Sequence, residues 1–333
     1  MKNKKELPIC CNPIYTAFLE YAFPCAILQS DRRLQNLLYV SFLNLYWDDN
    51  CDGKLQLYNF DLFDYLIFDN RIIDKTIINI DSKIINAIKK WLNEGYYIYA
   101  FLDESLLKET QLDYFSDKMH ESLIYGYDDN FCSFQILNFN KERRFGTISI
   151  NQKLLKKACL SKSYQTKFLL LKPNFDMVNI ELKLIEKRID YYLNGKNIRV
   201  GKCRNILFND YKWGIYIYDS LFSYVDKNIT LDFRIFKLLE EHKVYLYNVF
   251  KYLLKLLNFI EVEKDFLELV DTTKKMNLYI LRQNIVDKSE QKYKIREFLC
   301  DIRAKEEILL KKIQKEILKY INQHDNYNIE YLD

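Results

Sequence analysis

The sequence predicts an α+β protein in which a domain with an antiparallel sheet precedes a mainly helical domain. The first observation is a β-hairpin pattern at residues 122–137, where apolar and polar side chains alternate on either side of a central Asp-Asn pair. The second is a helical segment followed at once by a strand pattern, at residues 82–102. The third is a change after about residue 155 to long amphipathic segments. We therefore expect two domains, at residues 1–160 and 161–333.

The composition is that of a folded chain without a strong charge bias. Of the 333 residues, 49% are hydrophobic and 16% aromatic, and 50 basic side chains nearly balance 46 acidic ones. No basic stripe with interleaved aromatic residues is present, so nucleic acid is not an expected partner. No run of about 18 apolar residues occurs, and the lysine-rich N-terminus lacks the small residues of a signal-peptide cleavage site. The sequence therefore predicts a cytoplasmic protein that does not enter a membrane.

The eight cysteines are scattered along the chain without C-x-x-C spacing or neighbouring histidines. This arrangement argues against a zinc site, and no metal or other cofactor is expected. In a reducing compartment, most of these thiols are expected to be buried hydrophobic side chains and not reactive groups.

The first two cysteines precede a sequence that is typical of a helix start. Asn12 suits a helix N-cap and Pro13 suits the first helical position, and the apolar residues that follow lie on one helical face. This pattern places Cys10 and Cys11 beside a helix N-terminus, where the helix dipole favours a thiolate. A buried cysteine in a turn that enters the helix would give the same pattern, so these residues alone leave both interpretations open.

Between this segment and the hairpin, the chain alternates between helix and strand patterns. Residues 82–93 have helical spacing, Glu94-Gly95 ends that helix, and residues 96–102 are rich in aromatic and β-branched side chains typical of a strand. A polar connector at residues 103–105 leads toward the hairpin, and residues 145–150 supply a further strand. This order of elements predicts an α+β domain with an antiparallel sheet.

The C-terminal half contains several segments with helical spacing, the first of which is closed by Asn194-Gly195. These segments are residues 178–193, 213–225, 231–260, 266–285 and 292–321. His242 lies within the third of them and is expected to be structural. Alternating charges in the last segment indicate a solvated helix face, and these long helices leave room for a homodimer.

The hairpin contains the residues best suited to acid–base chemistry. His120, one of three histidines, enters the first strand, and Asn138 leaves the second, so the two side chains could face each other as a base and the group that orients it. A structural histidine and a turn residue are the alternatives, and Asn140 has the same strand parity as Asn138. Asp103, at the end of the preceding strand, suits either a substrate contact or a simple connector.

The order of these residues resembles that of papain-like cysteine proteases, in which a cysteine is followed by a histidine and then by an asparagine or aspartate. More narrowly, residues 120–129 (HESLIYGYDD) resemble the His-x-x-x-x-x-Gly-Tyr-Asp-Asp pattern of the C39-like peptidase superfamily. Within it, the chain is similar to the group of natural-product biosynthesis proteins typified by butirosin biosynthesis protein H. The similarity includes residues 94–103 (EGYYIYAFLD) and covers about residues 1–155, and the helical half is similar to the second domains of this group.

The resemblance implies a papain-like fold with Cys11 as nucleophile, His120 as its base and Asn138 as the group that orients the imidazole. Cys10 is the alternative nucleophile, although Cys11-Asn12-Pro13 is closer to the Cys-Gly-Pro of the C39-like pattern. Papain-like enzymes also carry a glutamine about six residues before the nucleophile, and lysines occupy those positions here. Loss of one oxyanion-hole donor typically costs about 100- to 1000-fold in rate, which favours an activated substrate such as a thioester.

The resemblance to the butirosin group implies a cysteine acyltransferase of natural-product biosynthesis. The acyl or aminoacyl group would pass from the thioester of an acyl or peptidyl carrier protein to the cysteine, and then to an amine to form an amide. Transfer to water, as in a peptidase or amidase, is the alternative within the enzymes. A catalytically inactive scaffold with the same fold is the alternative outside them.

Overall fold

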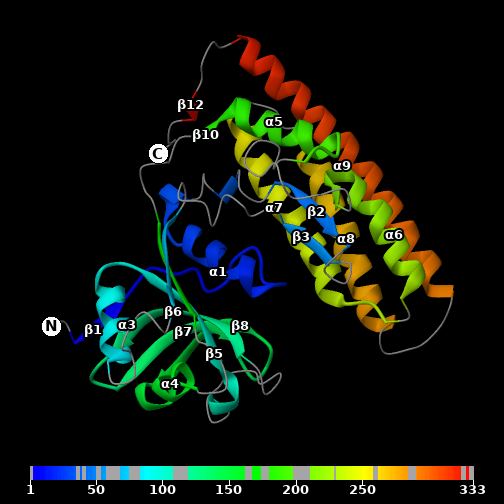
Figure 1. Cartoon of the computed structure of the whole chain (residues 1–333). Helices are drawn as coiled ribbons and strands as arrows, with labels where there is room; N and C mark the ends of the chain where they lie inside the picture. The colour runs from blue at the N-terminus through cyan, green and yellow to red at the C-terminus, as the bar shows by residue number, and fades with distance from the viewer. Residues whose placement is uncertain are drawn as a thin grey trace. The chain divides into compact units, whose positions relative to one another are not determined.

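The computed structural model divides the chain into two compact units, which are described separately (Figure 1). The sheet unit comprises residues 1–35 and 60–178, and the helical unit comprises residues 36–59 and 179–333. The structure describes residues 3–34, 38–39, 43–49, 54–57, 68–74, 83–107, 119–161, 167–173, 180–197, 211–228, 230–257, 262–283, 290–323 and 328–329.

This division differs from the expected continuous halves at residues 1–160 and 161–333. A strand at Lys167–Pro173 pairs within the first sheet, so the sheet unit continues to residue 178. Residues 36–59 belong with the helices, and they contain two short strands of the helical unit. Local sequence patterns do not reveal that residues 161–178 belong to the sheet unit or that residues 36–59 belong to the helical unit, because both assignments depend on pairing between segments far apart in the chain.

The sheet unit is built on a seven-stranded sheet in which every pair of neighbouring strands is antiparallel. The strand order is β4-β9-β5-β6-β7-β8, and β1 pairs with the second half of β6. The strands are β1 (Lys4–Glu6), β4 (Phe68–Asp74), β5 (Tyr97–Asp103), β6 (Met119–Asp128), β7 (Ser133–Phe139), β8 (Phe145–Asn151) and β9 (Lys167–Pro173). The predicted hairpin is therefore β6–β7, and the predicted mixed architecture with an antiparallel sheet is confirmed.

Three described helices pack against the two faces of this sheet (Figure 1). They are α1 (Leu19–Leu28), α3 (Ile84–Asn93) and α4 (Gln152–Cys159), with short 3-10 turns at η1 (Arg32–Leu34) and η2 (Glu104–Leu107). Phe23 of α1 packs on Tyr99 of β5, with ring centroids 5.4 Å apart. Trp91 of α3 packs on Phe168 of β9 at 5.9 Å. Since Phe168 is paired with Ala100, next to Tyr99, these two contacts identify opposite faces. We call them the α1 face and the α3 face.

The expectation that a helix starts at Asn12-Pro13 is wrong. The first helix begins at Leu19, after Phe18, which supplies no side-chain cap. The preceding coil is held by other partners: the Cys10 N–H donates to the Ala26 carbonyl at 3.0 Å, and the Ile14 N–H donates to Gln29 Oε1 at 2.7 Å. These bonds give the two N–H groups partners without a helical turn at this point of the chain. Neither cysteine therefore lies at the start of a helix.

The helical unit contains five described helices and a small three-stranded sheet in the order β11-β2-β3. Its elements are α5 (Leu182–Leu193), η3 (Gly214–Tyr216), α6 (Ile217–Lys227), α7 (Phe233–Leu257), α8 (Glu263–Gln283), α9 (Glu290–Gln323), β2 (Leu45–Asp48), β3 (Lys54–Leu57), β11 (Tyr211–Trp213), β10 (Ile180–Glu181) and β12 (Asn328–Ile329). The mainly helical C-terminal region is confirmed. Residue 213 ends a strand and does not begin a helix, because β11 pairs with β2.

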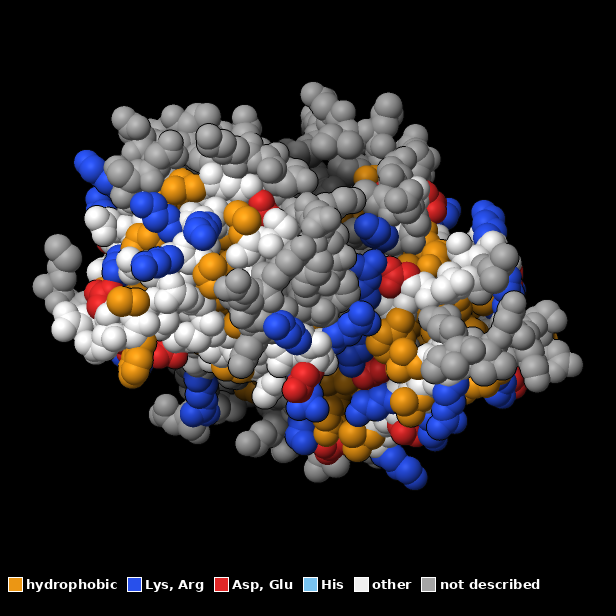
Figure 2. Space-filling model, turned by 90° about the horizontal axis from the view of Figure 1, so that it is seen from below, with side chains coloured by type: hydrophobic (Ala, Val, Ile, Leu, Met, Phe, Trp, Pro, Cys, Tyr) orange, Lys and Arg blue, Asp and Glu red, His pale blue; other side chains and the backbone are white. Residues whose placement is uncertain are grey.

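The described surface carries charges of both signs. On the face drawn in Figure 2, lysine and arginine side chains lie among acidic side chains and scattered hydrophobic ones. None of the described helices is long and apolar enough to cross a membrane.

Candidate functional site

Cys11 lies in the coil before α1 and is exposed on the α1 face of the sheet. Its Sγ is 3.3 Å from the Oγ1 of Thr147 on β8, and Thr147 Oγ1 accepts a hydrogen bond from the Tyr125 hydroxyl at 2.9 Å. Because Tyr125 is the donor to Thr147, the Thr147 hydroxyl can donate to the sulfur of Cys11. Burial raises the pKa of Tyr125 to about 12, so the phenol keeps its proton at neutral pH. The neighbouring Cys10 is half-buried.

Strand register assigns His120 of β6 to the α3 face of the sheet. His120 pairs with Leu102, and the alternation along β6 places its side chain with Ser122 on the α3 face, whereas Thr147 belongs to the α1 face. Its Nδ1 is 3.8 Å from Glu121 Oε2, and its side chain is 34% exposed. Strand register therefore assigns His120 and Thr147, the partner of Cys11, to opposite faces of the sheet.

Asn138 shares the α3 face with His120, but it lies inside β7 and not beyond its end. Its Nδ2 donates to the Ser122 Oγ at 2.8 Å and to the Glu121 carbonyl at 2.9 Å, and its Oδ1 accepts the N–H of Phe139 at 2.7 Å. Both Asn138 and Ser122 are buried. These bonds tie β6 to β7, so the described contacts of Asn138 give it a role in holding the hairpin.

Asp103, at the end of β5, links the 3-10 turn η2 to the residues that follow α4. One carboxylate oxygen accepts the Ser105 N–H and hydroxyl, and the other accepts the Ser161 hydroxyl. Burial alone would raise the pKa of Asp103, but the hydrogen bonds from Ser105 and Ser161 outweigh it, and the pKa lies below its usual value. A buried carboxylate with these partners acts as a connector, one of the two roles that its position indicated.

A polar surface extends from Cys11 along the α1 face of β7 and β8. Cross-strand pairing places Ser133 beside Asn151 and Gln135 beside Ser149, and Thr147 occupies the next position along β8. We call Ser133, Gln135, Ser149 and Asn151 the polar floor. They line an open cavity of about 490 Å³, whose margin also includes Lys4, Asp128 and Phe131.

The same face becomes apolar beyond Cys11. Phe139 and Phe145 are paired across β7 and β8, and Phe145 lies 6.2 Å from the ring of Phe23 in α1. Cys11 therefore contacts the sheet at the boundary between a half that α1 covers and a half that is open and polar. Neither Thr147 nor the polar floor was predicted from the sequence as part of a site. The signal was present as small polar side chains at every second position of β8, Thr147, Ser149 and Asn151.

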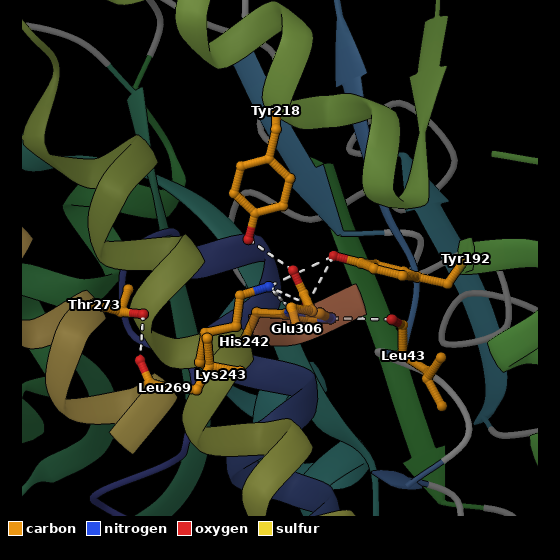
Figure 3. Close-up of polar contacts among 8 residues, drawn as sticks. All are labelled: Leu43, Tyr192, Tyr218, His242, Lys243, Leu269, Thr273 and Glu306. Carbon is orange, nitrogen blue, oxygen red and sulfur yellow. Dashed lines mark hydrogen bonds and ion pairs between the residues drawn. The ribbon is translucent and has the colours of Figure 1, made fainter. Parts of the chain in front are cut away.

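The helical unit contains a second polar cluster, which is fully buried (Figure 3). Lys243 of α7 forms an ion pair with Glu306 of α9, and Glu306 also accepts hydrogen bonds from Tyr192 at 3.0 Å and Tyr218 at 2.6 Å. Burial and then the Glu306 charge raise the pKa values of both tyrosines, so both remain donors at neutral pH.

His242 completes this cluster. Its Nε2 lies 3.0 Å from the Leu43 carbonyl, which can only accept, so Nε2 carries the proton and Nδ1 accepts from Lys243 at 3.1 Å. Burial and then the Lys243 charge hold the pKa of His242 well below its usual value. Because every member is buried and bonded within the cluster, the cluster fits a role in holding α5, α6, α7 and α9 together and not in catalysis.

Within the described residues, no three His, Cys, Asp or Glu side chains are grouped as a metal site. No protein-family model matches the chain, and no curated protein matches it.

Proposed function

We propose that the sheet unit is a thiol acyl-transfer module, related to papain-like C39-like proteins, in which Cys11 accepts an acyl group from a thioester. The observation that carries this proposal is the contact of the exposed Cys11 sulfur with the Thr147 hydroxyl, next to an open polar surface. The family relation rests on the sequence resemblance of residues 120–129.

The chemistry consists of two exchanges at one carbonyl carbon. The Cys11 sulfur attacks the thioester, the bond from the acyl carbon to the donor sulfur breaks, and the proton from Cys11 ends on the released donor thiol. An amine then attacks the acyl-cysteine, the bond to Cys11 breaks, and a proton from the amine returns to the thiol. The acyl group leaves as an amide, as the resemblance to the butirosin group implies.

The hydroxyl pair beside Cys11 supports the first exchange. Tyr125 donates to Thr147, so the Thr147 hydroxyl can donate its own proton to the Cys11 sulfur when that sulfur carries negative charge during the exchange. A hydrogen bond to a charged group is worth more than one between neutral groups. A thioester also releases a thiolate similar to the one that attacks, so the reaction needs less help from a base than amide cleavage does. In this proposal His120 is not the base, since it starts from the other face of the sheet.

The test is intact-mass spectrometry and peptide mapping after incubation with a small acyl thioester of N-acetylcysteamine. We expect a single acyl adduct on Cys11 that Cys11→Ala abolishes and His120→Ala retains. Cys132 and Cys300 are also exposed and serve as internal controls for non-specific reaction of accessible thiols. Thr147→Val should slow adduct formation by about 10- to 150-fold, the worth of a hydrogen bond to a charged group.

One outcome would remove the proposal, and another would change the residue that acts as base. Acyl groups spread equally over Cys11, Cys132 and Cys300 would show that exposure alone decides the reaction. An adduct on Cys11 that disappears in His120→Ala would leave acyl transfer to Cys11 standing and make His120 its base.

A non-catalytic binding module is the second candidate function. It is favoured by the placement of Cys11 and His120 on opposite faces and by the start of α1 at Leu19, which denies the cysteines a helix N-terminus. The absence of any acyl adduct at Cys11, with folding intact, would favour this candidate.

A further inference from the structure

The polar floor beside Cys11 has the dimensions of a binding groove for an extended chain. From Thr147, which contacts Cys11, to Asn151 at the far end, β8 advances by four residues, or about 13 Å. A chain of about four residues in extended conformation covers the same length. Ser149 and Asn151, in the part of this stretch farther from Cys11, line the cavity of about 490 Å³.

The side chains of the floor favour neutral hydrogen-bonding groups. Gln135 offers both an amide donor and an amide acceptor, and Ser133 and Ser149 offer hydroxyls that can serve either way. Asn151 caps α4 with its Oδ1, which accepts the Lys153 N–H at 2.9 Å. The cap does not use the two amide N–H groups of Asn151, so they can donate to a ligand. Amide groups in a ligand match this combination of donors and acceptors.

The only cation in the described lining of the cavity is paired with carboxylates. Lys4 lies 3.7 Å from Asp128 and 3.9 Å from Glu6, so one cation is shared between two carboxylates. Glu6 pairs with Gly126, in the same row of the sheet as Gln135. The described cavity lining therefore carries one cation and one carboxylate, and Lys4 also lies near Glu6, so the lining gives a carboxylate or phosphate no unpaired positive charge to bind.

We propose that the polar floor binds a neutral, extended, amide-bearing chain covalently linked to the acyl thioester, and so selects the substrates of Cys11. This inference rests on the proposed acyl transfer. Such a chain has two sources, a peptide on the acyl side of the thioester or a pantetheine arm on its thiol side. Both present amide N–H and C=O groups in an extended conformation.

The experiment compares rates of adduct formation on Cys11 with three thioesters. Acetyl-N-acetylcysteamine is the short reference, acetyl-pantetheine lengthens the thiol side, and a tetrapeptidyl thioester of N-acetylcysteamine lengthens the acyl side. One longer substrate is expected to react about 5- to 150-fold faster than the reference, the equivalent of two neutral hydrogen bonds. Which of the two gains identifies the source of the chain.

Variants locate the gain in the polar floor. Ser149→Trp fills the groove and Gln135→Ala removes the central amide, so both are expected to reduce the ratio of the rate with the longer substrate to the rate with the short one. Lys157→Trp adds the same ring at an exposed position of α4 outside the floor and should change neither rate. Circular dichroism and thermal unfolding confirm that each variant is folded.

The outcomes separate the two proposals. Equal rates for all three substrates, or an advantage that survives Ser149→Trp, would overturn the groove while acyl transfer to Cys11 stands. The absence of an adduct with every thioester would overturn both.

Discussion

The buried imidazole of His242 makes the stability of the helical unit depend on pH. In the folded chain both ring nitrogens are engaged, Nε2 as donor to the Leu43 carbonyl and Nδ1 as acceptor from Lys243. A second proton on Nδ1 would point at the Lys243 ammonium, although Glu306 Oε1 lies 4.0 Å away. Burial and the Lys243 charge therefore keep His242 neutral, with a pKa well below its usual value.

The sign of the effect follows from the unfolded state. There the imidazole has an ordinary pKa of about 6.5, so below that pH the unfolded chain binds a proton that the folded chain does not. Stability is full above this pH and falls as pH decreases, by up to about 1.4 kcal/mol per pH unit. Between pH 8 and pH 4.5 the loss from His242 has an upper limit of about 3 kcal/mol, reached when the folded imidazole stays neutral throughout.

Urea unfolding followed by tryptophan fluorescence measures this loss. Trp47 and Trp213 are buried in the helical unit, and a Trp91→Phe background removes the tryptophan of the sheet unit. We expect His242→Gln to lose less stability between pH 8 and pH 4.5 than the parent, by up to about 3 kcal/mol.

Asn277→Ala is the matched control, because Asn277 is buried and hydrogen-bonded in the same unit but does not titrate. It should lower stability by a similar amount at both pH values. Parallel losses in the parent and in His242→Gln would refute the neutral, buried imidazole.

Three further predictions follow from buried polar contacts and close packing. Lys243→Met removes the cation that is paired with the buried Glu306 carboxylate and should lower the free energy of unfolding by about 3–5 kcal/mol. In a double-mutant cycle, the Lys243→Met, Glu306→Leu variant should lose less stability than the sum of the two single variants. Gly126→Ala places a methyl group 2.9 Å from a backbone oxygen of β1 and should cost about 1–3 kcal/mol, while Gly146→Ala, with nothing within 4 Å, should be close to neutral; equal effects in urea unfolding would contradict this. Asn138→Leu should lower the stability of the sheet unit by about 1–3 kcal/mol, because it leaves the Ser122 hydroxyl and the Glu121 carbonyl without their amide partner, and an unchanged unfolding midpoint would count against its role in the hairpin.

Elements with strong local signals were predictable from the sequence. The helix that became α3 has its apolar residues at helical spacing and ends before Gly95, which takes a φ of 90°. The hairpin β6–β7 followed from alternating side chains around a polar turn. In both cases neighbouring residues along the chain supply the information, so the pattern and the structure agree.

The helix start at Asn12-Pro13 was wrong because local preference competed with distant partners. Coil residues at positions 10 and 14 find hydrogen-bond partners near the end of α1, and these bonds hold the coil where a capped helix was expected. The cysteines therefore belong to a coil over the sheet. A cap motif of this kind contributes about 1 kcal/mol, which tertiary contacts can outweigh.

The sequence by itself determined the class of architecture, the elements with clear periodicity and the residues able to do chemistry. Only the tertiary structure decided which of those residues meet. Side chains in a strand alternate between faces, so the face that a residue joins depends on the register of every strand between it and its partner. That register places Thr147 on the face where Cys11 lies and His120 on the other. Register is a property of paired strands, and no single segment of the chain contains it.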